Sequence, residues 1–113
     1  MTSHQTFADP EDGTWLKIDV LPGVGLLPLA QPVPEGSIHR ARLAEGTVIP
    51  VHMHPADEFV LVLSGMVETG GRRCQAGAFW TTPAKTRQGP HIAITDVELL
   101  TVRLGAMGPF GEG

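Results

Sequence analysis

Glycine and proline recur along the whole chain, and their frequency is the feature that most limits the folds open to it. The 113 residues include 14 glycines and 10 prolines. Glycine favours turns, and proline interrupts helices because it lacks a backbone N–H group and clashes with the preceding helical turn. The segments between these residues leave no room for a long helix. We therefore expect short strands joined by turns.

The segments between the turns are short, apolar or alternating, as β-strands are. Strands are predicted over residues 15–20, 24–30, 37–44, 59–63, 66–69, 72–75, 78–82, 91–95 and 97–104. Gly70 and Gly71 supply the positive φ angles of a tight hairpin loop. Many short strands with turn signals about every eight to twelve residues predict an all-β, antiparallel sandwich or barrel.

One domain is expected, because this length suits a single hydrophobic core and the sequence shows no internal repeat. We assign the polar residues 1–13 to an N-terminal arm, residues 14–105 to the barrel domain and the glycine-rich residues 106–113 to a C-terminal tail.

Composition argues against several classes of partner. The net charge of −4 disfavours nucleic acid and anionic membranes. The longest unbroken apolar run, residues 59–63, is far too short to span a bilayer, and the first six residues do not resemble a signal peptide. Cys74 is the single cysteine, so no internal disulfide can form, which suits a reducing compartment. We expect a cytoplasmic protein with no membrane and no nucleic-acid partner.

The residues best suited to chemistry are two histidines and a glutamate in the middle of the chain. His52 and His54 are one residue apart, and in a strand the side chains at i and i+2 point to the same face. With the carboxylate of Glu58, they would form a chelate for a divalent transition metal. The alternative is a pair of surface histidines on an edge strand, in which case the spacing of Glu58 is accidental. A closed structural zinc site is disfavoured because Cys74 is alone.

This stretch resembles the first motif of the cupin superfamily, G-x5-H-x-H-x3,4-E-x6-G. Every defined position is filled, by Gly46, His52, His54, Glu58 and Gly65. The resemblance is to small, single-domain, metal-binding cupins. It implies an antiparallel double-stranded β-helix, also called a jelly-roll barrel, with a metal inside it.

The second cupin motif, G-x5-P-x-G-x2-H-x3-N, is matched only in part. Gly77 and Pro83 fit, whereas Lys85 stands where the glycine is expected and Thr95 replaces the asparagine. The histidine comes three residues late, at His91. The resemblance therefore identifies His91 as the last metal ligand of a degenerate second motif.

The ligand set implied by the resemblance is His52, His54, Glu58 and His91. Imidazole and carboxylate donors suit Fe(II), which we favour, or Mn, Ni, Cu, Co or Zn, rather than Ca or Mg. Four protein ligands leave an octahedral metal two open positions for a small-molecule substrate or O2. Six further residues are predicted to be available to line the pocket, with strand register deciding which of them do: His39, Arg40, Arg42, Phe79, Trp80 and Thr82.

The resemblance also narrows the function. Small cupins with three histidines and a glutamate include oxygenases that act on diketones, hydroxyketones, flavonols or thiols. We expect a mononuclear metal-dependent dioxygenase for a small diketone- or hydroxyketone-like substrate, although no catalytic residue is assigned. Three alternatives stay open because the fold does not decide between them. They are a non-redox lyase or isomerase, a non-enzymatic ligand-binding or sensor module, and a degenerate cupin whose metal is incidental.

One strand predicts a protein partner. Phe59, Leu61 and Leu63 alternate with Val60 and Val62, so both faces of this strand are apolar. Strands of this kind are buried on both faces, whereas a small barrel has one interior. The second face needs cover from the N-terminal segment or from another subunit. A homodimer packed sheet to sheet is predicted.

Overall fold

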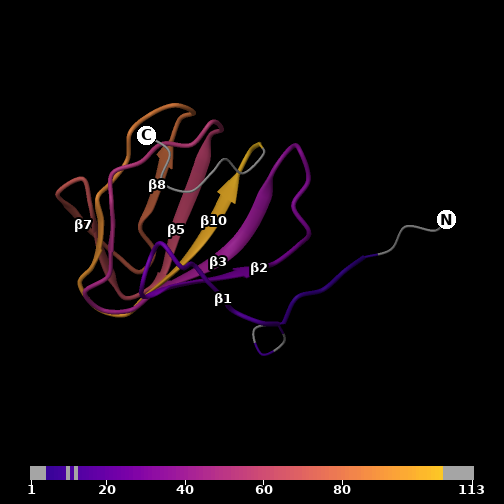
Figure 1. Ribbon diagram of the computed structural model, residues 1–113, viewed down its shortest axis with the longest axis horizontal. Coiled ribbons are helices and arrows are strands. Elements are labelled where there is room, and N and C mark those ends of the chain that lie inside the picture. The colour runs from indigo at the N-terminus through magenta and orange to yellow at the C-terminus, as the bar shows by residue number, and fades with distance from the viewer. Residues whose placement is uncertain (1–4, 10, 12, 106–113) are drawn as a thin grey trace.

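The computed structural model describes residues 5–9, 11 and 13–105, and every regular element within these ranges is a β-strand (Figure 1). The prediction of an all-β fold is confirmed. No helix among the described residues is long and apolar enough to cross a membrane. The strands are β1 (Leu16–Lys17), β2 (Val24–Pro28), β3 (Ser37–Leu43), β4 (Val48–Ile49), β5 (Glu58–Ser64), β6 (Met66–Thr69), β7 (Arg72–Gln75), β8 (Phe79–Thr82), β9 (His91–Ala93) and β10 (Val97–Arg103).

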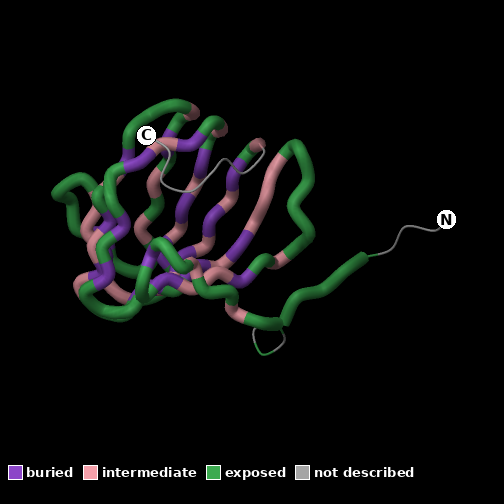
Figure 2. The backbone as a smooth tube through the Cα atoms, in the orientation of Figure 1, coloured by how far each residue is buried: buried purple, intermediate pink, exposed green. Residues whose placement is uncertain are grey.

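The strands form two antiparallel sheets. The larger has the order β1-β2-β3-β10-β5-β8, and the smaller has the order β4-β9-β6-β7. Buried residues alternate with less buried ones along the central strands of the larger sheet (Figure 2). The largest fully buried side chains of the core are Leu43, Val62 and Val67, which come from both sheets. The apolar faces of the two sheets therefore close on one core.

Strand β10 shows how the alternation of side chains positions the site. Its inward residues, Val97, Leu99, Thr101 and Arg103, are all buried, whereas the residues between them are half-buried. Strand geometry sends every second side chain to the same face. Arg103 thus enters the interior on the same face as the core, and only 3% of its surface is exposed.

The histidine segment is less regular than its sequence predicts. His52 forms an isolated bridge with Gln88: His52 N donates to Gln88 O at 3.0 Å, and Gln88 N donates to His52 O at 2.8 Å. The rest of the segment is not strand, because Pro50 and Pro55 have no N–H group for a ladder. His52 and His54 still point to the same side, as predicted, because both side chains are buried in the interior.

Lys85 and Thr95, two residues that depart from the second motif, both take part in the local structure of their turns. Lys85 has φ of 61°, in the left-handed region that glycine usually occupies. Its N–H group donates to His54 O at 2.8 Å, which ties this loop to the histidine segment. At the position of the missing asparagine, Thr95 Oγ1 accepts from Met66 N at 3.0 Å. Lys85 thus adopts a glycine-like conformation, and Thr95 uses its side chain to hold the start of β6.

The remaining sequence predictions concern the N-terminal and C-terminal segments of the chain. The segment predicted as a strand over 15–20 pairs only at Leu16–Lys17, both of which are exposed. Residues 5–9 extend away from the barrel as an arm, and Phe7 is 83% exposed (Figure 1). The tail predicted over 106–113 lies outside the described residues.

Candidate metal centre

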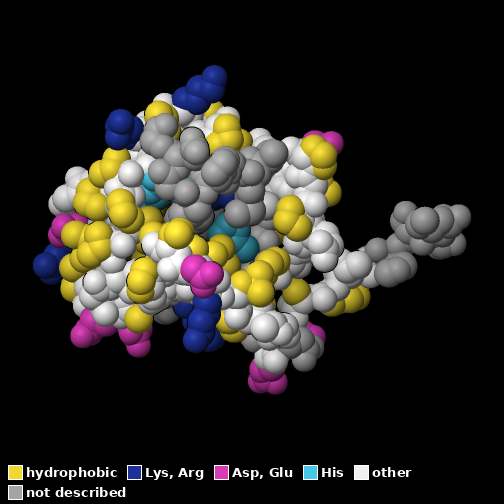
Figure 3. All heavy atoms as spheres, in the orientation of Figure 1, with side chains coloured by type: hydrophobic (Ala, Val, Ile, Leu, Met, Phe, Trp, Pro, Cys, Tyr) yellow, Lys and Arg dark blue, Asp and Glu magenta, His cyan; other side chains and the backbone are white. Residues whose placement is uncertain are grey.

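Three of the predicted ligands gather inside the barrel. His52 and His54 come from the segment before β5, and His91 is the first residue of β9. The ring centroid of His52 lies 4.9 Å from that of His54 and 5.4 Å from that of His91. All three side chains are buried. Histidine side chains are visible among hydrophobic ones on the face drawn in Figure 3.

Hydrogen bonds hold two of these rings from behind. His52 Nδ1 lies 2.8 Å from Pro50 O, and His91 Nδ1 lies 2.8 Å from Thr69 Oγ1. A ring that donates from Nδ1 to a carbonyl keeps its lone pair at Nε2 when it is neutral. Metal-binding histidines are oriented in this way by their other ring nitrogen. Neutral His52 therefore keeps its lone pair at Nε2, and the Thr69 hydroxyl, which can donate or accept, holds the ring of His91 in place.

The interior favours neutral imidazoles. Burial, followed by the positive charge of Arg103, lowers the pKa of His54 to about 4. Burial, followed by the neighbouring His52, lowers the pKa of His91 to about 4. The nearby His39 also has its pKa lowered to about 4, by burial and then by Arg103. At neutral pH these three rings are uncharged, and an uncharged imidazole is the form that binds metals.

Glu58 is placed beside the histidines, but protein groups already hold both of its oxygens. Arg103 donates to Glu58 Oε2 from Nε at 3.1 Å and from Nη2 at 2.5 Å. Gln88 Nε2 donates to Oε1 at 3.2 Å. Burial alone would raise the pKa of Glu58, but Arg103 and then His54 lower it below its usual value. Glu58 is thus an ionised carboxylate paired with a buried guanidinium.

The residues of this site meet some of the requirements for binding a metal ion and fail others. The three histidines have the donor chemistry of a divalent transition-metal site. However, within 5–9, 11 and 13–105 no group of three or more histidine, cysteine, aspartate or glutamate side chains is arranged to hold a metal ion. His54 Nε2 is 3.6 Å from Glu58 Oε2, and Arg103 contacts both atoms. The donors are gathered, and a cationic side chain stands between two of them.

A small cavity of about 50 Å³ adjoins these residues. His39, Trp80 and Thr101 line it together with the histidines, Glu58 and Arg103, and the rest of its wall is aliphatic. The Trp80 ring stacks on His91 with centroids 5.6 Å apart. The cavity therefore brings a few polar groups together within an apolar wall.

Strand register decides which of the six residues predicted to be available to line the pocket face the cavity and which face away from it. His39 and Trp80 line the cavity, and Thr82 is buried next to it, donating to Gln88 Oε1 at 3.3 Å. Phe79 lies on the other face of β8 and is 56% exposed. Arg40 and Arg42 also point away from the cavity, and both are paired with Glu98.

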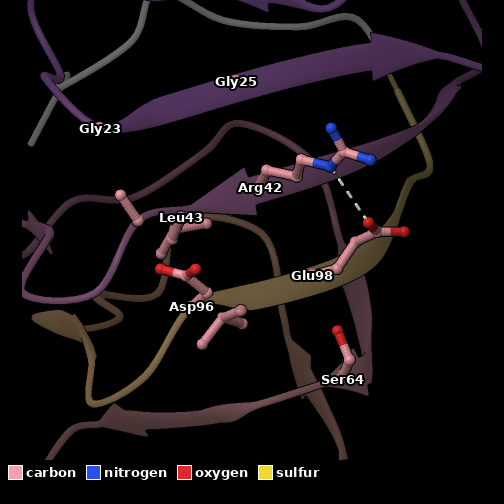
Figure 4. Close-up of a pocket in the computed structure, with 9 residues that line it drawn as sticks. Gly23, Gly25, Arg42, Leu43, Ser64, Asp96 and Glu98 are labelled. Carbon is pink, nitrogen blue, oxygen red and sulfur yellow. Dashed lines mark hydrogen bonds and ion pairs between the residues drawn. The ribbon is translucent and has the colours of Figure 1, made fainter.

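A larger surface hollow of about 440 Å³ lies between β2, β3 and β10 (Figure 4). Its charged residues include Arg42, Glu98 and Asp96. Arg42 Nε donates to Glu98 Oε1 at 3.3 Å, and Asp96 Oδ1 accepts from Glu45 N at 2.8 Å. No histidine lines this hollow, and these charged groups already have partners. The smaller cavity is the better candidate for chemistry.

Sequence reasoning missed two residues of the site, Arg103 and Gln88. A signal for Arg103 was present, because an arginine stands in phase with Val97 and Leu99 on a strand whose inward face is apolar. Gln88 stands where the second motif expects its histidine, three residues before His91, so the motif itself pointed to this position.

Comparison with known proteins identifies the family. The family model described as the ChrR Cupin-like domain matches residues 3–108. The chain therefore belongs to this cupin family, and the predicted cupin resemblance is confirmed. A search of curated proteins finds no match.

Solved structures agree on the fold. An RmlC-like cupin from Shewanella frigidimarina matches with a TM-score of 0.79 and 20% identity over 94% of this chain and 96% of that one. An acetylacetone dioxygenase from Acinetobacter johnsonii matches with a TM-score of 0.79 and 11% identity over 93% and 77%. The complex of Rhodobacter sphaeroides SigE with the anti-sigma ChrR matches with a TM-score of 0.71 and 23% identity over 84% and 50%. These likenesses confirm the jelly-roll cupin fold, and the fold alone.

Proposed function

We propose that this cupin is a mononuclear metal-dependent dioxygenase acting on a small diketone- or hydroxyketone-like molecule. The observation that carries the proposal is the gathering of His52, His54 and His91, buried together beside a cavity. Fe(II) is the metal we favour, and Mn, Ni, Cu, Co or Zn suits the same donors. The fold likeness to an acetylacetone dioxygenase supports the choice of reaction, although that protein shares only 11% identity.

The chain's own residues would serve this chemistry in two ways. A divalent metal supplies Lewis acidity toward substrate oxygen atoms and, for iron, redox chemistry with O2. The hydrogen bonds of His52 and His91 fix their rings before any metal arrives. Val60, Leu99 and Trp80 provide an apolar wall that limits water around the bound substrate.

Oxygen consumption tests the proposed reaction. The protein is purified without a tag, loaded anaerobically with Fe(II), and then mixed with O2 and either acetylacetone or a hydroxyketone. We expect substrate-dependent O2 uptake that is absent from the metal-free protein. Metal binding without O2 uptake across a panel of diketones and hydroxyketones would reject the dioxygenase. Conversion of a substrate without O2 uptake would favour a lyase or isomerase.

A second candidate, a metal-bound sensor or ligand-binding module, is favoured by the family match itself. The matching family carries the name of ChrR, and ChrR is an anti-sigma protein in the similar complex. Tight Zn²⁺ binding with no turnover of any tested substrate would support this role over the enzyme.

We also propose a homodimer formed through the outer face of the larger sheet. Leu63 and Phe79 are 38% and 56% exposed there, and Phe59 stacks on Phe79 with centroids 6.2 Å apart. An apolar sheet face of this kind is typical of subunit contacts. A dimeric mass by light scattering at micromolar concentration is expected, and a monomeric mass would reject the proposal.

The reducing cytoplasm is the proposed location, because Cys74 is a buried free thiol.

A further inference from the structure

Arg103 holds the position between two predicted metal ligands. Its Nη2 atom lies 2.5 Å from Glu58 Oε2 and 3.4 Å from His54 Nε2. Those two acceptor atoms are themselves 3.6 Å apart. A metal ion bound to Glu58 Oε2 and His54 Nε2 would contact the same two atoms. The guanidinium therefore already supplies a positive charge at this corner of the site.

Arg103 is also difficult to displace. Its Nε and Nη2 groups use both lone pairs of Glu58 Oε2, while Gln88 engages Oε1. Arginine does not lose its proton in proteins, so the pair cannot be relieved by neutralising Arg103. Glu58 and Arg103 are both almost fully buried, and separating a buried ion pair leaves an uncompensated charge.

We propose that Arg103 is a resident cation that retains Glu58, so that a metal ion bound in this site is held by the three histidines without the carboxylate. The inference rests on the proposed metal centre and revises its ligand set from four residues to three. A metal ion on His54 Nε2 would replace the 3.4 Å contact of that atom with Arg103 Nη2. In the opposing view, Glu58 is a metal ligand and Arg103 merely orients it from behind.

The two views predict opposite effects of Arg103→Met on the affinity for Zn²⁺, measured by competition with a chromophoric chelator. If Arg103 is a resident cation, its removal frees Glu58 to bind the metal and removes a like charge, so we expect at least about tenfold tighter binding. If Arg103 orients a ligand, its removal weakens binding by about 10- to 100-fold. Arg40→Met is the matched control, because Arg40 pairs with Glu98 away from the cavity.

A double variant reports on Glu58 without leaving Arg103 as an uncompensated charge. Glu58→Gln/Arg103→Met removes both charges, so we expect it to bind Zn²⁺ within about threefold of the native chain, whereas loss of a true ligand weakens binding far more. This variant also keeps the test open if Arg103→Met does not fold without metal. The visible spectrum of bound Co²⁺ gives an independent readout: it should change in Arg103→Met and stay unchanged in the double variant.

The outcomes separate this inference from the metal centre on which it rests. Weaker or unchanged binding in Arg103→Met, or loss of binding in Glu58→Gln/Arg103→Met, overturns the resident cation, while native Zn²⁺ binding leaves the metal centre in place. Absence of Zn²⁺ binding by both the native chain and Arg103→Met overturns both. Tighter binding in Arg103→Met together with native-like binding in Glu58→Gln/Arg103→Met is the expected result.

Discussion

Two arginine–glutamate clusters share strand β10 and differ mainly in the face on which they lie. On the inner face, Arg103 pairs with Glu58, and their side chains are 4% and 6% exposed. On the outer face, Glu98 pairs with Arg40 and Arg42, and those arginines are 26% and 57% exposed. The chemistry of the two clusters is the same. Comparing the inner and outer clusters therefore shows how burial affects an arginine–glutamate ion pair.

Burial makes the inner pair sensitive to the loss of either member. An exposed ion pair is screened by water and salt and contributes little to stability. A buried pair has lost its hydration, so each charge depends on the other. The inner pair can therefore influence the histidines beside it, whereas the outer pair faces solvent and the surface hollow of Figure 4.

The largest expected effect comes from breaking the inner pair. Glu58→Ala leaves Arg103 as an uncompensated buried charge, so we expect the metal-free protein to lose about 3–5 kcal/mol of unfolding free energy. Urea denaturation followed by circular dichroism measures this loss. The double variant Glu58→Gln/Arg103→Met is the control and should retain most of the stability. A loss below about 1 kcal/mol in Glu58→Ala would show that burial does not distinguish the two clusters.

The sequence located part of this inner site, for reasons that can be stated residue by residue. The spacing of His52, His54 and Glu58 is local, so it is visible in the sequence. The ion pair joins Glu58 to a residue 45 positions away, and no local pattern encodes such a contact. The inward phase of Arg103 was visible, but its partner depends on the register between β5 and β10.

The all-β fold could be predicted from the sequence, but the residues of each strand that face the interior could not. Frequent glycine and proline exclude long helices, so an all-β chain followed from the sequence. Which residues of β3 and β8 face inward depends on register, and a shift of one residue exchanges the faces. For this reason His39 and Trp80 reached the cavity, while Arg42 and Phe79 did not.

A change of pH is expected to have an intermediate effect on the free energy of unfolding. Burial lowers the pKa of His39 to about 4, below the ordinary value of 6.5 that it has when unfolded. Between these values the unfolded chain binds more protons, so stability is full above pH 6.5 and falls as the pH drops toward 4. Each such histidine contributes a slope of at most about 1.4 kcal/mol per pH unit.

The variant His39→Gln tests this account of the slope. Urea denaturation of the metal-free protein across the same pH range should give a shallower loss of stability for the variant than for the native chain. A slope unchanged by the substitution would mean that His39 is not buried as a neutral ring in solution.

The smallest effect is expected on the outer face. Arg42→Ala removes an arginine that is largely exposed, contacts Glu98 and lies 4.0 Å over the Trp15 ring. We expect a loss below about 1 kcal/mol that shrinks further at high salt. Urea denaturation at low and high ionic strength measures it. A salt-insensitive loss as large as that of Glu58→Ala would remove the contrast between the two faces.

The metal content of untagged protein tests the central claim, a metal centre built on the three histidines, most directly. Elemental analysis of the native chain and of His52→Ala is the measurement, with circular dichroism to verify that the variant is folded. We predict about one transition-metal ion per native chain and loss of stoichiometric metal from the folded variant. Full metal occupancy in His52→Ala, or none in the native chain supplied with metal, would contradict the account.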